Sequence, residues 1–223
     1  MNHLSKEQTA SREKTLGTAL LLSAPGPLVT GIAVITSQSS TQLADFLRRG
    51  VELAAIFISW WVFRKLSRGD TLEAAQRARL ERAAGLSTAA AMAVSGVVLL
   101  GVALSRVAVF APSGSVVMGL VIAVLGLLTN GWFWRRYAAM SREQYSAVIA
   151  SQEQLYRAKT SVDLCVAAAL AAVAIAPAHP ATRYVDLLGS VIVAGYLLWS
   201  GLRAARSQGL GIKALYERAR KAP

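Results

Sequence analysis

The sequence has few charged residues and few of the side chains that usually hold transition metals. Asp, Glu, Lys and Arg make up 16% of the 223 residues, whereas soluble domains carry about a quarter. A single cysteine, Cys165, excludes an intrachain disulfide framework. The two histidines, His3 and His179, form no Cys/His cluster with zinc spacing. These deficits argue against an ordinary soluble enzyme and against a disulfide-stapled or zinc-stapled domain.

The sequence also lacks the short motifs of common catalytic and nucleotide-binding sites. It has no P-loop, no glycine fingerprint following a strand, no GxSxG nucleophile elbow and no HExxH zinc motif. No nucleophile and base are spaced as a recognisable pair. An integral-membrane enzyme would rest on a few acids alone, so we expect a protein that is not an enzyme and that holds no cofactor.

Apolar residues take the place of the missing charge. They make up 54% of the chain, and the mean hydropathy is +0.44. A membrane-spanning helix needs about 20 mainly apolar residues, and six segments approach that length: 16–36, 43–63, 83–107, 116–134, 158–176 and 184–202. The sequence therefore predicts an all-α polytopic membrane protein with six transmembrane helices. In the first segment Pro25-Gly26-Pro27 predicts a kinked span, and a cleaved signal peptide is the alternative.

Basic residues outnumber acidic ones by 24 to 12, and their placement predicts the topology. They gather before the first span, between spans two and three, between spans four and five, and after span six, whereas the other side has Arg106 and Arg183. By the positive-inside rule both termini are cytoplasmic, as expected of a bacterial inner-membrane protein. We expect the lipid bilayer as partner and no nucleic acid, because no basic face carries interleaved aromatics.

These patterns divide the chain into one membrane domain and two short ends. We expect a cytoplasmic N-terminal tail over 1–15, a six-helix transmembrane domain over 16–204 and a basic cytoplasmic C-terminal tail over 205–223. In the last segment, apolar residues alternate with Lys and Arg, which is typical of a helix lying on a membrane surface.

Charged residues inside two of the spans indicate a candidate site. Span two contains Asp45, Arg48, Arg49 and Glu52, and span five contains Lys159 and Asp163. Ionisable groups at bilayer depth are costly and mark functional sites by default. Residues four apart share a helix face, so each span offers a base and an acid together: Arg48 with Glu52, and Lys159 with Asp163. Asn130 in span four is a supporting polar candidate for hydrogen bonds between helices.

Two interpretations of this charged group remain open. In the functional one it binds a substrate, ion or proton, and Glu52 is the best candidate for a reversible proton carrier. In the structural one it is a buried ion-pair network that locks span two to span five, and the protein is an accessory or partner-binding subunit.

Three stretches resemble the transmembrane domain of the cation diffusion facilitator family, over roughly residues 16 to 206. Span two reads Ala44-Asp45-Phe46-Leu47-Arg48-Arg49-Gly50-Val51-Glu52, similar to the family's A-D-A-x-H-S-x-x-D. Arg79-Leu80-Glu81-Arg82 is similar to its R-x-E motif. Span six runs from Tyr184-Val185-Asp186 to Ser200-Gly201 and Arg203, similar to W-x-D-P and S-G-x-R. The resemblance implies a six-helix bundle, proton-coupled efflux of zinc or another divalent cation, and a homodimer. It also places spans two and five, with one and four, around the polar group, and spans three and six to one side.

The chain departs from this family at the metal-binding positions. The family pattern needs His or Asp followed by Asp four residues later in spans two and five, and here Arg48 and Lys159 occupy the first of each pair. Arginine offers no lone pair, and lysine must first lose a proton. We therefore expect secondary transport with a substrate other than zinc. A divalent metal remains an alternative substrate, with Asp45, Glu52 and Asp163 as its ligands.

Overall fold

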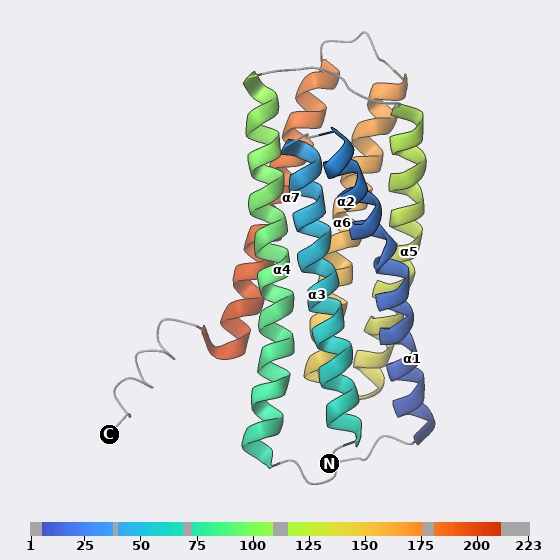
Figure 1. Ribbon diagram of the computed structural model, residues 1–223, viewed down its shortest axis with the longest axis vertical. Coiled ribbons are helices and arrows are strands. Elements are labelled where there is room, and N and C mark those ends of the chain that lie inside the picture. Colours follow the sequence, from blue (N-terminus) through green and yellow to red (C-terminus); the bar gives the residue numbers. More distant parts are fainter. Residues whose placement is uncertain (1–5, 38–39, 69–72, 109–115, 176–180, 211–223) are drawn as a thin grey trace, which may run out of the picture.

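The computed structural model describes residues 6–37, 40–68, 73–108, 116–175 and 181–210, and within these ranges the secondary structure is helical. The helices are α1 (Lys6–Ser23), α2 (Pro25–Ser37), α3 (Ser40–Arg68), α4 (Ala74–Ala108), α5 (Val116–Glu143), α6 (Ala147–Ile175), α7 (Ala181–Ala205) and the short π-helix η1 (Arg206–Leu210). They lie along one long axis as an elongated bundle (Figure 1). The prediction of an all-α bundle is confirmed.

The six predicted spans correspond to α1 with α2, then α3, α4, α5, α6 and α7 in order. By length and composition, the ranges Ala74–Ser105 and Leu188–Gln208 are apolar enough to cross a membrane. Large aliphatic side chains also point outward from the bundle, including Leu104, Leu125, Leu128 and Ile192, each more than half exposed. Such an apolar exterior suits contact with lipid tails rather than water.

The first span is broken where the sequence predicts a kink. Helix α1 ends with a backbone hydrogen bond from Ala24 to Leu20 of 3.0 Å. Pro25 starts α2 and has no N–H to continue the ladder of α1. Gly26 lies against the side chain of Arg49, since a Cβ at that glycine would come within 3.4 Å of its Nη1. The break therefore brings the chain close to the charged part of α3.

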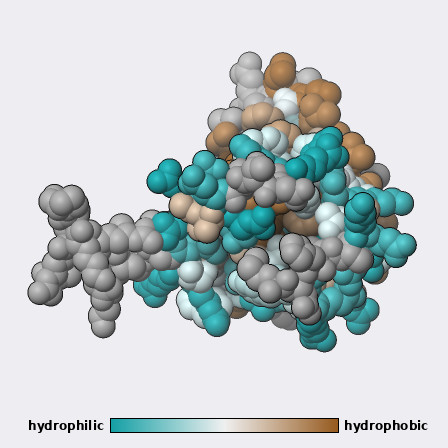
Figure 2. Space-filling model, turned by 90° about the horizontal axis from the view of Figure 1, so that it is seen from below, coloured by the Kyte–Doolittle hydropathy of each residue, from teal (hydrophilic) through white to brown (hydrophobic). Residues whose placement is uncertain are grey.

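The two ends of the bundle differ in charge. We call the end at which α1 begins, α3 ends and α6 begins the basic end; its described basic residues include Arg64, Lys65, Arg68, Arg77, Arg79, Arg82, Arg135, Arg136, Arg142 and Arg157. Figure 2 shows hydrophilic residues gathered on this face. Helices α4, α5 and α6 all extend past the predicted apolar spans toward it, with α5 ending at Glu143 and α6 beginning at Ala147.

Helix α1 is anchored to the bundle through a buried arginine. Arg12 is 1% exposed, and its guanidinium donates to the backbone carbonyls of Met140 at 2.7 Å and Gln144 at 3.0 Å. These carbonyls lie at the C-terminal end of α5, where helices leave carbonyl groups without partners. Helix α1 begins at Lys6, ten residues before the predicted start of the membrane domain at residue 16. Arg12 attaches this additional part of the helix to α5.

We expect Arg12→Met to loosen α1 from α5 and to lower the free energy of unfolding by about 1–3 kcal/mol, because the buried carbonyl of Met140 and the partly buried carbonyl of Gln144 lose a charged donor. Thermal unfolding of the purified protein measures this effect. Lys14→Met, at an exposed position of the same helix, is the control and should unfold at the wild-type temperature. Equal unfolding temperatures for the two variants would contradict the anchoring role.

Candidate functional site

Glu52 lies at the centre of a buried group of polar side chains from three helices. Its Oε1 is 3.5 Å from Arg48 Nη1 on the same helix, and its Oε2 is 3.4 Å from Lys159 Nζ on α6. Ser95 of α4 donates a hydrogen bond of 3.2 Å to Oε1. Glu52 is 7% exposed. Its carboxylate therefore joins α3, α4 and α6 through two cations and one hydroxyl, which is the compensation that a buried charge needs.

Asp163 has a different environment, although it follows Lys159 by one helical turn. Its Oδ2 accepts a hydrogen bond of 2.6 Å from Nδ2 of Asn130 on α5. Gly126, one turn from Asn130, makes room for this carboxylate, because a Cβ there would lie 3.1 Å from Oδ2. The two acids of the predicted group are thus held by different partners, Glu52 by cations and Asp163 by an amide.

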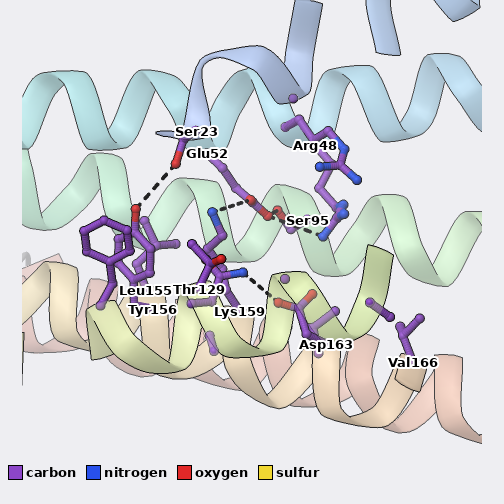
Figure 3. A pocket seen from close by; sticks show the side chains of 18 of the residues that line it. Ser23, Arg48, Glu52, Ser95, Thr129, Leu155, Tyr156, Lys159, Asp163 and Val166 are labelled. Atoms are coloured by element: carbon purple, nitrogen blue, oxygen red, sulfur yellow. Dashed lines mark hydrogen bonds and ion pairs between the residues drawn. The ribbon is translucent and has the colours of Figure 1, made fainter. Parts of the chain in front are cut away.

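A cavity of about 430 Å³ lies against both acids. Its polar lining includes Ser23, Arg48, Arg49, Glu52, Ser95, Thr129, Asn130, Tyr156, Lys159 and Asp163. In Figure 3 Arg48 and Asp163 lie toward one end of this space, and Leu155 and Tyr156 toward the other. Along their helices Arg48 and Asp163 are on the side away from the basic end, so the cavity extends toward the opposite end of the bundle.

The basic side of the cavity is closed by packed side chains. Phe133 and Tyr156 line its inner wall, with ring centroids 5.0 Å apart. The Tyr156 hydroxyl is 3.4 Å from Ser23 Oγ, and Lys159 Nζ sits 5.1 Å from the Tyr156 ring centroid. Both aromatic residues belong to the buried core. In this conformation the polar group is thus separated from the basic end by aromatic and aliphatic packing.

A second polar layer lies within that packing. Gln152 is fully buried, and its Nε2 donates to Ser59 Oγ at 2.8 Å and to Thr88 Oγ1 at 3.4 Å. Each member stands seven residues from a member of the first layer: Ser59 from Glu52, Thr88 from Ser95, and Gln152 from Lys159. Seven residues are two helical turns, about 10.5 Å along the axis. Helices α3, α4 and α6 are thus joined by polar contacts at two levels of the bundle.

The comparisons with known proteins show the family. A search of curated proteins finds no match. A family model described as the cation efflux transmembrane domain matches residues 18–212. The chain belongs to this cation efflux family. The resemblance to cation diffusion facilitators predicted from the sequence is therefore confirmed, and with it an integral membrane protein from a family of transporters.

Within this cation efflux fold, the structure brings together most of the residues predicted for the site. Arg48, Arg49, Glu52, Asn130, Lys159 and Asp163 all line the cavity. Asp45 belongs to α3, but its side chain lies outside the described part of the chain. Arg48 and Lys159 both pair with Glu52, and Asn130 makes the hydrogen bond between helices that the sequence suggests.

Sequence reasoning missed four polar side chains of the site: Ser23, Ser95, Thr129 and Tyr156. The sequence predicts no polar role for Ser95 in span three, whereas its hydroxyl donates a hydrogen bond to Glu52. Span three therefore contributes to the polar group and does not lie wholly to one side of it. For Tyr156 the sequence does hold a signal. Tyr156 lies three residues before Lys159, and residues three apart share a helix face.

The cation efflux chain offers few metal ligands at this place. Within the described ranges, no three His, Cys, Asp or Glu side chains come together as a group that could hold a metal ion. The ligand positions of the family pattern carry Arg48 and Lys159, whose nitrogens are 3.5 Å and 3.4 Å from the carboxylate of Glu52. A metal at Glu52 would have to displace both cations.

Proposed function

We propose that this member of the cation efflux family is a proton-coupled secondary transporter that exports a substrate other than zinc. In this proposal both termini face the cytoplasm of a bacterial inner membrane, so the basic end is cytoplasmic. The family relation also favours a homodimer. The proposal rests chiefly on one observation, the buried carboxylate of Glu52 shared between Arg48 and Lys159.

This arrangement suits a proton carrier. A proton on Glu52 would cancel the charge that attracts Lys159 of α6 and Arg48 of α3, so protonation would weaken the connection between the two helices. Loss of the proton would restore it. Transport by alternating access needs such a change between two packings of the same helices. The cavity would face outward in the described conformation, and opening toward the cytoplasm would require the aromatic packing around Tyr156 to part.

The same two cations argue against zinc as the substrate. Zinc binds three or four N, O or S donors in tetrahedral geometry. Arginine offers no lone pair, and lysine must lose a proton before it can donate one. We therefore propose that this chain keeps the family's transport mechanism but carries a different substrate.

The contacts of Glu52 also favour a second candidate function. A carboxylate fully compensated by two cations and a hydroxyl can serve as a structural connection between α3, α4 and α6. In that case the protein moves no substrate and acts as a membrane subunit that binds a partner. The two functions differ in whether any compound drives protons across the membrane.

Proteoliposomes that contain a trapped pH-indicator dye test the proposal. Zinc, cobalt, manganese and a set of small organic cations and zwitterions are added one at a time. We expect at least one organic compound to drive proton movement in protein-containing vesicles and not in empty ones, and we expect Asp163→Asn to reduce it at least ten-fold. Proton movement driven by zinc alone would contradict the altered substrate, and no movement with any compound would favour the second function.

A further inference from the structure

The cavity has an acidic wall and a basic wall. Asp163 of α6 and its partner Asn130 of α5 lie on one side, whereas Arg48 and Arg49 come from α3 on the other. Figure 3 shows Arg48 and Asp163 extending from different helices toward the same space. A ligand in this cavity would therefore meet groups of opposite charge at its two sides.

Asp163 is the acid best placed to bind a ligand. Both oxygens of Glu52 are engaged, Oε1 by Arg48 and Ser95 and Oε2 by Lys159. Asp163 has one hydrogen bond from a neutral amide, at its Oδ2. Among the described residues Asp163 forms no ion pair, although Lys159 and Arg48 are close enough to act on its charge. Its carboxylate can therefore accept a cationic group such as an ammonium.

The opposite wall suits an acidic group. Guanidinium groups present five N–H donors in a planar fork that binds carboxylate or phosphate through two bonds at once. Arg49 is half-buried, its side chain lies close to Gly26, and both residues line the cavity. Arg48 lies one residue earlier on α3 and also lines the cavity.

The volume and the remaining lining favour an organic molecule over a bare ion. The cavity measures about 430 Å³, within the range of pockets that hold small organic ligands, roughly 300–1,000 Å³. Aliphatic side chains from several helices complete its wall: Leu22, Leu53, Leu99, Ile122, Leu125 and Val166. A dehydrated metal ion would leave most of this space unfilled and would make no use of the apolar surface.

The charges that line the cavity favour a ligand that carries both signs. A dication would meet Arg48, Arg49 and Lys159 as well as the acids, at membrane depth, where uncompensated charge is costly. A molecule with one positive and one negative group matches both walls.

We infer that the cavity binds a small organic zwitterion, with its amine at Asp163 and Asn130, its acid group at Arg48 and Arg49, and its apolar body against the aliphatic lining. The inference rests on the proposed function and names the substrate class that the transporter would export. It assigns Asp163 to substrate binding and leaves Glu52 to the proton.

Isothermal calorimetry on the full chain in lipid nanodiscs tests the inference with two sets of matched probes. The first set is leucine, 3-methylbutylamine and 4-methylpentanoate, and the second is phenylalanine, 2-phenylethylamine and 3-phenylpropanoate. In each set the second compound lacks the carboxylate and the third lacks the amine. We expect one of the two zwitterions to bind at least ten-fold more tightly than both of its analogues. Equal affinity for the amine, or no binding of either zwitterion, overturns the inference.

Variants assign the two walls separately. Asp163→Asn should weaken binding of the zwitterion at least ten-fold and leave the weak binding of the acid analogue unchanged. Arg49→Gln should weaken binding of the zwitterion and of the acid analogue and leave binding of the amine unchanged. Ser161→Ala is the control, because its hydroxyl bonds the Arg157 carbonyl of its own helix and does not line the cavity. Should Arg49→Gln fail to fold, Asn130→Ala, which releases Asp163, provides a second weakening variant for the acidic wall.

The outcomes separate this inference from the proposed function. Zwitterion binding without any compound-driven proton movement would reject transport and keep the binding site. Proton movement driven by a metal ion, with no zwitterion binding, would keep transport and reject the inference. Micromolar zinc binding that is lost in Asp163→Asn would also reject it.

Discussion

Replacement of Glu52 by glutamine is expected to destabilise the protein by about 3–5 kcal/mol, the cost of removing one partner from a buried ion pair. The carboxylate is 3.5 Å from Arg48 and 3.4 Å from Lys159. Both cations would keep their charge without the acid that compensates it. Arg48 and Lys159 are each 16% exposed as side chains, so water can replace little of the lost attraction.

Thermal unfolding in detergent measures this loss, and the chain offers a matched control. Glu13 on α1 also pairs with two cations, Arg64 at 3.5 Å and Arg68 at 3.4 Å, but at the exposed basic end. Ion pairs of that kind contribute about 0–1 kcal/mol, so Glu13→Gln should have a small effect. If both variants unfold at the same temperature, Glu52 does not hold the helices together.

A double variant separates the structural role of Glu52 from its role in transport. Glu52→Gln with Lys159→Met removes the acid and one of its cations, so it should recover part of the stability lost in Glu52→Gln alone. If Glu52 carries the transported proton, the double variant should fold better and still move no protons. Recovery of both stability and proton movement would assign Glu52 a structural role only.

The sequence predicted which residues make up the site better than which of them pair. The spacing of Arg48 and Glu52 places both on one face of α3 in any helix, so their ion pair follows from local geometry. The ion-pair partner of Lys159 does not follow from local geometry. Asp163 is the neighbour of Lys159 four residues along α6, yet Lys159 pairs with Glu52 on α3. Asp163 instead accepts a hydrogen bond from Asn130 on α5. Packing of α3, α5 and α6 decides this, and no spacing within one helix reveals it.

The positions of the helix ends were also harder to predict than the helices. Hydropathy marks where a segment can contact lipid and ends the fourth span at residue 134. The polar stretch 138–156 predicts that the helices on either side continue beyond their spans, as α5 does to Glu143, but it does not predict the residue at which each helix ends. Polar residues can extend a helix into water without changing its backbone hydrogen bonds. The same limit applies to α1, which begins at Lys6. Its attachment through Arg12 depends on carbonyls of α5 that lie far away in the sequence.

Replacement of Gly201 by alanine is the second change expected to have a large effect. Helices α4 and α7 pack side by side, and a Cβ at Gly201 would come within 2.8 Å of the Ala93 nitrogen and 2.9 Å of the Ala89 carbonyl oxygen. Both atoms belong to the backbone of α4 and cannot rotate away. The methyl group would therefore push the two helices apart, which costs about 1–3 kcal/mol in a well-packed interior.

Gly195, on the same helix, is a matched control because a Cβ there meets nothing within 4 Å. Gly195→Ala should keep or slightly raise the unfolding temperature, since alanine favours helix more than glycine by about 1 kcal/mol. Gly201→Ala should lower it, although the intrinsic helix preference acts in the opposite direction. Unfolding at the same temperature in both variants would mean that α4 and α7 are not in close contact at Gly201. The glycine of the Ser200-Gly201-x-Arg203 pattern would then need an explanation other than helix packing.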